Sequence, residues 1–562
     1  MTRTLATVAA AAGLVAYFWW QGERFLAANG PTFDEAPHLV AGVAYWTTGD
    51  FRMNREDPPL MKLWWALPLV VGDGPPFPYA VAAATNHDHW HAGVAYLYDS
   101  GVPYRELLDP ARRMNLAVGC GVVLVAGWWA WRAWGSRLAG LAATAFAATD
   151  PNLLALSCVL STDVGLTFFA LLSAYLLWEY TATPTRTLLT AAGVSLGLML
   201  GSKLSAVGVA AGFGVAGLVF VLRGGVLALP GVFIPSDEAK TKRRLSAALD
   251  LAFRLAVVAV VVLAATYEFV NFPEWGRGLK FQLTRGDHGD GRLYLCGELS
   301  RTGWYHYFLV VLALKLPLGL VCGGAAGVVG RNVWARRSAW LVVPPLVFLA
   351  GASAARVDLG VRVVLPAVPF LYVVAARLAA PGAWGAARLV FLGGCVAWAG
   401  VSGWAAAPHQ IAYSNELAGG PAGVLRHVAD SNVDWGQGLP LLKEYADREG
   451  IDAVYLSYFG TDRPEAHGLR FQALPGYGRV GPAGGGAIPA EARRHVVAVS
   501  ANNLLGIYLN DADAFAWLRD RPPTAVLGGC VYVFDLTGDP AARNREIFFP
   551  AARTNGRPPA SE

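Results

Sequence analysis

Charged residues are scarce in this sequence: they make up 15% of its 562 residues, whereas hydrophobic residues make up 55%. A soluble globular protein usually carries about a quarter charged residues, so this composition excludes an ordinary soluble protein. The deficit lies in long apolar runs such as 251–270, 308–328 and 389–401. Because a helix needs about 20 apolar residues to cross the bilayer core, a series of such runs predicts a polytopic α-helical membrane protein.

Cysteine is also rare, with six residues in the chain, and this excludes a scaffold held by disulfides. The sequence has no GxxxxGK[ST] loop, and no GxGxxG motif follows a predicted strand, so direct use of ATP or of a nucleotide sugar is unsupported. The basic stretch at 240–244 predicts a topology signal beside anionic lipid rather than a nucleic-acid site. We therefore expect membrane lipids, and no nucleic acid, among the partners.

Hydropathy predicts about eleven transmembrane helices. If the N-terminus is cytoplasmic, the basic residues gather in the cytoplasmic loops, which is the positive-inside pattern of a multi-pass protein of the plasma (inner) membrane. Three segments are then extracytoplasmic: 29–110, 271–303 and the region after residue 406. The predicted spans lie near 5–27, 112–134, 138–150, 160–179, 187–201, 204–222, 251–270, 304–328, 339–355, 363–379 and 387–406.

The chain changes character after residue 406, where it becomes polar. Strand-like runs occur at 453–459, 495–500 and 524–536, and helix-like segments at 422–429 and 439–448. This pattern predicts a small extracytoplasmic α/β domain over 407–550, which is a normal domain size. We expect a transmembrane domain over 1–406 and a disordered tail over 551–562.

Two adjacent carboxylates open the first predicted outer loop, in the sequence TFDEAPH at 32–38. Asp34 could take a proton from a substrate while Glu35 orients it. His38 lies four residues after Asp34 and would share its face of a helix. The alternative is a helix start, in which Thr32 or Asp34 caps the helix and both acids favour its positive end. On the local sequence alone, the helix start is the simpler interpretation.

A second acidic pair, Glu56 and Asp57, precedes two prolines in the sequence GDFRMNREDPPL at 49–60. Proline restricts both its own backbone and that of the residue before it, so this segment could hold the two carboxylates rigidly. The alternative is a solvated turn before a helix at 60–71 that lies in the membrane interface.

Four ionisable residues lie within or at the edge of apolar spans. Such groups are costly in a membrane, so they usually line a cavity, pair with one another or serve function. On the predicted topology all four lie towards the outer side, where Asp34 also lies. The alternative for the two lysines is that they reach the interface as anchors; for the arginine we favour function. The four residues are Asp163, Lys203, Lys315 and Arg362.

The order of these motifs resembles the protein O-mannosyltransferase and aminoarabinose-transferase superfamily, which comprises family 39-like glycosyltransferases of the GT-C fold. The first outer loop of that superfamily is resembled by the order of three motifs here: DExxH, then GDF, then an acidic residue before PPL. The resemblance covers about 30–460. Its further motifs are DPN at 150–152, STD at 161–163, GSK at 201–203, YLCGE at 294–298, GWYHY at 303–307, LKLP at 314–317, GVRVVLP at 360–366, NE at 415–416 and DSNVDWGQ at 430–437.

The resemblance implies a GT-C-like catalytic domain and an inverting glycosyltransferase that moves a sugar from a polyprenyl-phosphate carrier to an acceptor on the outer face. Asp34 is then the base and Glu35 a supporting acid. Asp57 departs from the pattern, since many relatives have histidine before the two prolines. The cations Arg362, Lys203 and Lys315 would stabilise the phosphate leaving group. We expect the substrate-binding residues to be His38, Glu56, Asp57, Asp163, Lys203, Tyr294, Glu298, Lys315 and Arg362.

This reaction requires no cofactor, although a divalent metal is compatible with it. The sequence HDHWH at 87–91 alternates like a ligand set but has no second cluster, and DHGD at 287–290 is a weak substrate-side candidate. Trp435 could stack on a sugar, but we favour a role in docking the C-terminal domain. The sugar is open, and so is the acceptor, which could be protein, lipid or polymer.

Two other classes of function are compatible with parts of the sequence. A secondary transporter would also bury ionisable residues, but it usually shows paired broken helices in matching halves. A membrane-anchored glycan-binding protein would use the C-terminal domain and keep the helices as a scaffold. In that protein Asp34 and Arg362 would tolerate substitution.

Overall fold

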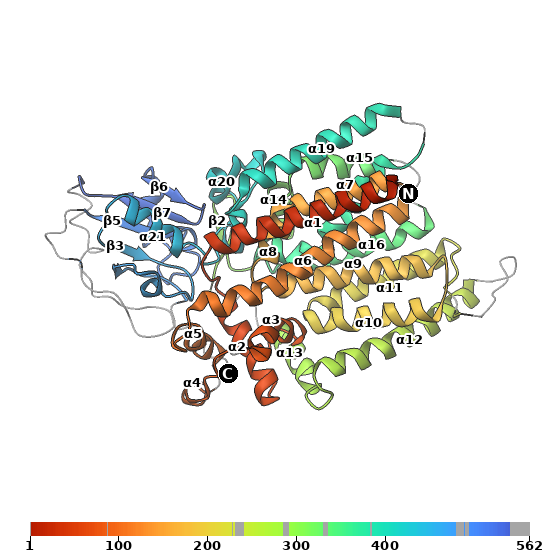
Figure 1. Ribbon diagram of the computed structural model, residues 1–562, viewed down its shortest axis with the longest axis horizontal. Helices are drawn as coiled ribbons and strands as arrows, with labels where there is room; N and C mark the ends of the chain where they lie inside the picture. Colours follow the sequence, from red (N-terminus) through yellow and green to blue (C-terminus); the bar gives the residue numbers. More distant parts are fainter. Residues whose placement is uncertain are drawn as a thin grey trace.

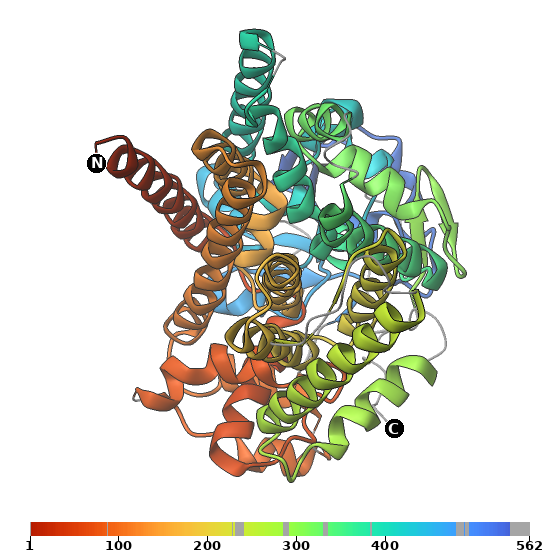
Figure 2. The same ribbon diagram turned by 90° about the vertical axis from the view of Figure 1, so that its right-hand side faces the viewer.

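The computed structural model describes residues 2–72, 74–86, 88–227, 229–230, 241–284, 291–329, 335–382, 385–478, 488 and 494–539. Most of these residues are helical, and the long helices run side by side as an elongated bundle (Figure 1). The β-sheet of the C-terminal region lies at one end of this bundle, and the short helices α2 to α5 lie towards the same end. The N-terminus lies at the opposite end. In the view along the bundle, α1 (Thr2–Ala28) is at its edge (Figure 2).

Within the described residues, five helical segments are long and apolar enough to cross a membrane, and two bent helix pairs raise this number to as many as seven. The chain is therefore a multi-pass membrane protein, while the number of eleven stays a prediction. The other predicted spans coincide with helices that fall short on length or hydropathy, such as α7 (Arg137–Thr149), α10 (Arg186–Ser202) and α11 (Ala206–Leu222). The five segments are α6 (Tyr104–Trp134), α12 (Thr241–Thr266), η2 with α16 (Arg336–Ala355), α17 to η4 (Val361–Ala379) and α19 (Gly385–Ala406).

The structure corrects the single straight span predicted at 304–328. Here α14 (Tyr307–Lys315) and α15 (Leu318–Val328) meet at an angle of 113°. Pro317 causes this break, because proline disfavours the helical conformation in the residue before it. Leu316 is accordingly extended, with a ψ of 141°. The second bent pair, α8 (Pro151–Ser157) and α9 (Thr162–Tyr180), meets at 118°.

The segment after α1 forms four short helices. The predicted helix start is confirmed, because α2 (Glu35–Thr48) begins directly after Asp34, whose side chain nevertheless makes no capping hydrogen bond. The predicted helix at 60–71 is also confirmed as α3 (Leu60–Val71). Both pack closely: a Cβ added to Gly42 of α2 would lie 2.2 Å from a carbonyl oxygen of α3. The remaining two helices are α4 (Tyr79–Ala84) and α5 (His89–Tyr98).

The segment that follows α12 contains α13 (Pro273–Thr284) and a small hairpin. Its two strands, β1 (Leu293–Leu295) and β2 (Glu298–Ser300), pair antiparallel. The turn of the hairpin places Cys296 and Gly297 in the left-handed region of the backbone.

The C-terminal region forms a five-stranded sheet in the order β4-β3-β5-β7-β6. β3, β4 and β5 are parallel, and β7 runs antiparallel to both its neighbours. Strands form within all three predicted runs, and helix α21 (Leu439–Arg448) coincides with the predicted segment at 439–448. The run at 422–429 holds the end of the short helix α20 (Gly420–Gly423) and the 3-10 helix η7 (Val424–Arg426). The tail 551–562 lies outside the described residues. The strands are β3 (Val454–Ser457), β4 (Phe471–Ala473), β5 (Val496–Ser500), β6 (Ala525–Leu527) and β7 (Val531–Asp535).

The sheet shares a hydrophobic core with the helical part. One cluster of buried side chains joins Val497 and Tyr532 of the sheet to Tyr294 of β1, Phe308 of α14 and Val364 of α17. A continuous core fixes the sheet relative to the helices. Residues of the two parts can therefore form one site where they meet.

Candidate active site

An ion pair between Asp34 and Arg362 lies where the helical part meets the C-terminal region. The Arg362 Nη1 atom is 2.9 Å from Asp34 Oδ2, although the two residues are 328 positions apart in the chain. Their side chains are 24% and 18% exposed, so neither is closed off from solvent. Asp34 uses no side-chain oxygen to cap α2, and its carboxylate therefore faces the arginine instead. This pair joins the predicted base to a predicted phosphate-binding residue.

The guanidinium of Arg362 is held by groups that come from distant parts of the chain. It lies 4.4 Å from the ring centroid of Trp435, a cation–π distance. Asp163 and Asp430 also act on it electrostatically, in addition to Asp34. Asp430 in turn accepts a hydrogen bond from the hydroxyl of Tyr508. Arg362 thus has several carboxylates around one cation.

A second ion pair joins two other predicted site residues. The Lys203 Nζ atom is 2.6 Å from Asp163 Oδ1, and the lysine side chain is 23% exposed. Asp163 lies in the first turn of α9 and also accepts a hydrogen bond from the Ser161 hydroxyl. Since Asp163 acts on Arg362 as well, the two ion pairs belong to one charged region.

Asp57 and His38 also face each other, with 3.4 Å between Asp57 Oδ2 and His38 Nε2. The other ring nitrogen of His38 lies 2.8 Å from the carbonyl oxygen of Leu160, so it donates a hydrogen there and the ring is fixed. Burial by itself would raise the pKa of Asp57, but the contact with His38 and the charge of Lys203 lower it below its ordinary value. The Asp57 carboxyl group is therefore ionised at neutral pH, although it departs from the motif.

Glu35 is in a closed environment. Both oxygens of its carboxylate bind Arg112, at 2.8 Å and 2.5 Å, and neither side chain is more than 1% exposed. The backbone amides of Thr32 and Leu160 donate to the same carboxylate. In this arrangement Glu35 holds the start of α2 in place. Because both of its oxygens are occupied, we interpret Glu35 as a positioning residue and no longer as a supporting catalytic acid.

Lys315 is also not available to a substrate in this geometry. Its side chain is buried, and the ammonium donates to the carbonyl oxygens of Ile411 and Asn432, at 2.8 Å and 2.6 Å. Asn432 binds the helical part a second time, because its Oδ1 accepts the backbone amide of Val361. Both residues dock the C-terminal region onto the helices beside Arg362. Asn432 belongs to the same motif as Trp435, for which we favoured a docking role.

The other predicted substrate-binding residues are not joined to Asp34 or Arg362 by a described contact. Tyr294 is buried, and its hydroxyl donates to the carbonyl oxygen of Arg426 at 3.3 Å. Glu298 lies on β2 and is exposed. Glu56 is half-buried, and its carbonyl oxygen accepts a hydrogen bond from Gln282. Their assignment stays a prediction.

The structure places at the site several residues that sequence reasoning had missed. Arg112 closes the pair with Glu35, and Asp430 and Tyr508 border Arg362. A signal existed for Arg112, because it stands at the first position of a predicted span, where an ionisable residue is costly. Asp430 has a φ of 58°, but this left-handed backbone carries no signature in the sequence.

No group of three or more histidine, cysteine, aspartate or glutamate side chains is arranged to hold a metal ion in the part of the chain that the structure describes. The predicted ligand set at 287–290 and His87 lie outside the described residues. Within the set at 87–91, Asp88 caps α5 and binds His91 at 2.6 Å.

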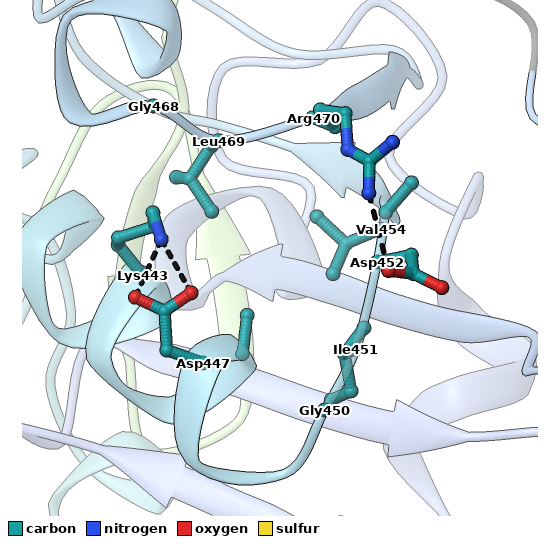
Figure 3. Close-up of a pocket in the computed structure, with 11 residues that line it drawn as sticks. Lys443, Asp447, Gly450, Ile451, Asp452, Val454, Gly468, Leu469 and Arg470 are labelled. Carbon is teal, nitrogen blue, oxygen red and sulfur yellow. Dashed lines mark hydrogen bonds and ion pairs between the residues drawn. The ribbon is translucent and has the colours of Figure 1, made fainter.

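The hollow of about 240 Å³ shown in Figure 3 is a separate feature of the C-terminal region. Its charged residues pair across an exposed surface, Lys443 with Asp447 and Arg470 with Asp452. No predicted site residue lines it. We therefore take the charged region around Asp34 and Arg362 as the candidate active site.

Part of the charged region lies in a segment that is similar to a known protein family. Residues 94–272 match the family model of dolichyl-phosphate-mannose-protein mannosyltransferase. This match confirms the resemblance found in the sequence and the class of enzyme, a glycosyltransferase that uses a lipid-phosphate-linked sugar. Asp163 and Lys203 lie inside the matched segment. No curated protein sequence matches the chain.

Three solved structures resemble the chain at low identity. ArnT from Cupriavidus metallidurans in the apo state is 13% identical, with a TM-score of 0.48 over 95% of this chain and 98% of its own. The Pmt1-Pmt2 protein O-mannosyltransferase complex of S. cerevisiae bound to the sugar donor is 18% identical, with a TM-score of 0.33 over 52% and 40%. The oligosaccharyltransferase AglB from Archaeoglobus fulgidus is 12% identical, with a TM-score of 0.37 over 69% and 56%. We draw no functional conclusion from likenesses of this size.

Proposed function

We propose that the protein is an inverting glycosyltransferase that moves a sugar from a polyprenyl-phosphate carrier to an acceptor on the outer face of the membrane. The observation that carries this proposal is the partly exposed ion pair between Asp34 and Arg362. A carboxylate beside a guanidinium supplies both a proton acceptor and a phosphate ligand at one place. The family match supports the same donor class.

In the proposed reaction Arg362 and Lys203 bind the phosphate of the donor. The phosphate competes with Asp34 for the guanidinium of Arg362, and this competition frees the carboxylate. Asp34 then takes the proton of an acceptor hydroxyl or amine, and the acceptor atom attacks the anomeric carbon. The bond between that carbon and the phosphate oxygen breaks, and its electron pair leaves with the polyprenyl phosphate. Two cations stabilise the charge that develops there.

A single displacement of this kind inverts the configuration at the anomeric carbon. It needs one carboxylate base and no covalent intermediate on the enzyme. Asp34 supplies that base, and Glu35 cannot act as a second one while Arg112 and two backbone amides occupy its oxygens.

We infer the orientation in the membrane from the two ends of the bundle and from the basic loops. Helices α2 to α5 and the sheet lie towards the end opposite to the N-terminus (Figure 1). If the basic loops and the N-terminus are cytoplasmic, the charged region lies on the outer side of the plasma (inner) membrane. No nucleotide is needed there, since the carrier lipid brings the activated sugar.

The name of the matched family suggests which substrates to try first. It describes transfer of mannose from dolichyl phosphate to protein. Polyprenyl-phosphate mannose is therefore the first donor to test and a protein the first acceptor. A lipid or a polymer acceptor is an alternative outcome of the same experiment.

The test is transfer by the purified full-length protein from a panel of polyprenyl-phosphate sugars, beginning with mannose. Wild type is compared with Asp34→Asn and with a matched control, Asp50→Asn. Asp50 lies in the same segment but pairs with exposed Arg52 on the surface. We expect transfer by wild type and by the control, and a 10²- to 10⁴-fold loss in Asp34→Asn, because general base catalysis contributes about that much.

Other outcomes of this experiment would contradict the proposal. An active wild type with an equally active Asp34→Asn would keep the transferase and remove Asp34 as its base. No transfer from any donor by folded protein would favour the membrane-anchored glycan-binding protein.

A further inference from the structure

Helix α5 lies against the start of α2, where Asp34 is placed. Gly93 of α5 makes this close approach, because a Cβ added there would lie 2.5 Å from the carbonyl carbon of Ala36. His89 is four residues before Gly93, and residues at this spacing share one face of a helix. The first turn of α5 therefore brings His89 to the side of α2 that carries Asp34, His38 and the charged region.

His89 is buried and has an unpartnered ring nitrogen. The residue is 5% exposed, and its Nε2 has no hydrogen-bond partner among the described atoms. Its polar neighbours are already occupied, because Asp88 accepts the amide of Trp90 and binds His91. A buried polar atom without a partner costs free energy, which a hydrogen bond to a bound ligand would offset.

The imidazole of His89 is neutral at physiological pH. Burial lowers its pKa to about 4, and the charged groups around it oppose one another. Asp88 of its own helix and Asp34 of α2 favour its protonation, whereas Lys62 of α3 and His38 of α2 disfavour it. A neutral imidazole offers one hydrogen-bond donor and one acceptor, which suits a hydroxyl group rather than a phosphate.

Aromatic rings border His89 on the side of the C-terminal region. The ring centroid of Trp90 lies 5.3 Å from that of His89, and Phe33 packs against Trp90 at 5.0 Å. The ring of Phe33 also stacks on the rings of Phe459 and Tyr477. A hydroxyl donor or acceptor beside aromatic faces is a common arrangement where a protein binds a ligand with both polar and apolar edges.

We propose that His89 is a substrate-binding residue that forms a hydrogen bond with a hydroxyl of the donor sugar. The inference rests on the proposed function, in which Arg362 and Lys203 hold the phosphate and Asp34 faces the acceptor. The transferred sugar must then lie between these groups. The Nε2 atom of His89 is an unpartnered group on the side of α2 near Asp34, which acts on the imidazole electrostatically.

The test measures binding, without turnover, of two probes by the full-length protein in lipid nanodiscs. The probes are polyprenyl-phosphate mannose and the same polyprenyl phosphate without sugar. We expect wild type to bind the sugar-bearing lipid more tightly. His89→Phe keeps a ring but no hydrogen-bonding nitrogen, and should weaken binding of the sugar-bearing lipid about tenfold, the size expected for a hydrogen bond lost in a buried site. Binding of the bare carrier should not change.

Two further variants separate sugar binding from a structural role. His89→Gln carries an amide that can replace the ring nitrogen, so it should keep most of the preference for the sugar-bearing lipid. If His89→Phe folds poorly, His89→Met is the test variant, because it also lacks a hydrogen-bonding nitrogen and should show the same selective loss. His91→Asn is the matched control on the same helix, with an exposed side chain, and should behave as wild type.

Each other result contradicts the inference. If His89→Phe keeps the preference, or weakens both probes equally, His89 does not bind the sugar. If wild type binds both probes alike, no sugar contact exists. If wild type binds neither probe, the proposed function itself is wrong.

Discussion

Asp34 and Glu35 are neighbours in the chain, and each pairs with an arginine, yet the two ion pairs lie in different surroundings. The pair of Asp34 and Arg362 is partly exposed and is joined by a single hydrogen bond. The pair of Glu35 and Arg112 is fully buried, and every oxygen of its carboxylate is occupied. An open pair can exchange its partner for a substrate, whereas a closed pair can only hold the fold. The comparison therefore separates a catalytic from a positioning role for two adjacent acids.

The largest effect on stability should come from the closed pair. Glu35→Gln removes the charge opposite Arg112 and leaves a buried guanidinium unpaired. Removing one partner of a buried pair costs about 3–5 kcal/mol, so we expect a large drop in the thermal unfolding midpoint in detergent. An unchanged unfolding midpoint would mean that the pair of Glu35 and Arg112 does not stabilise the fold.

A second prediction concerns the open region and tests Lys203. Lys203→Gln keeps a donor for Asp163 but loses the positive charge. A charge-assisted hydrogen bond contributes roughly 1.5–3 kcal/mol, so we expect KM for the lipid donor to rise at least tenfold, with a small change in the unfolding midpoint. A lower unfolding midpoint with an unchanged KM would mean that the pair of Lys203 and Asp163 has a structural role, as we propose for Glu35 and Arg112.

Asp434 offers a third, pH-dependent prediction for a buried acid outside the membrane-spanning helices. Burial raises its pKa to about 7, well above its ordinary value. Between these two values the folded protein binds a proton that the unfolded chain has lost, so stability falls as pH rises. We expect a loss of about 1.4 kcal/mol per pH unit from about pH 4 to 7.

The measurement for Asp434 is the unfolding midpoint of wild type and Asp434→Asn at pH 5 and pH 7. The substitution should flatten the pH dependence, because asparagine does not titrate. An equal slope in both proteins would show that other groups cause it.

The smallest effect should come from the exposed pair beside the hollow of the C-terminal region. Arg470 and Asp452 are both largely exposed. Exposed pairs contribute about 0–1 kcal/mol, so Arg470→Ala should change neither the unfolding midpoint nor transfer beyond that range. A loss of transfer in this variant would move the site away from Asp34.

The sequence was sufficient for features that depend on local patterns. The helix start after Asp34, the helix at 439–448 and the strands of the sheet follow from short stretches of chain. The charges at 163, 203 and 362 were recognised because a membrane makes an ionisable group costly. The break before Pro317 was missed, although proline carries a signal for it, because the surrounding apolar run was long enough for one span.

The partners of the site residues could not be predicted in this way. Glu35 meets Arg112 across 77 residues, and Asp34 meets Arg362 across 328. Two acidic neighbours look alike in the sequence, and only the packing of α6 and α17 decides which of them is buried. The burial of Lys315 and the free nitrogen of His89 depend on the same long-range packing.

The most direct test of this account compares Asp34→Asn with Glu35→Gln in transfer per folded molecule, with the unfolding midpoint measured on the same preparations. We predict that Asp34→Asn keeps the wild-type midpoint and loses transfer 10²- to 10⁴-fold. Glu35→Gln should lower the midpoint while its folded fraction still transfers sugar. A folded, inactive Glu35→Gln beside an active Asp34→Asn would contradict the account.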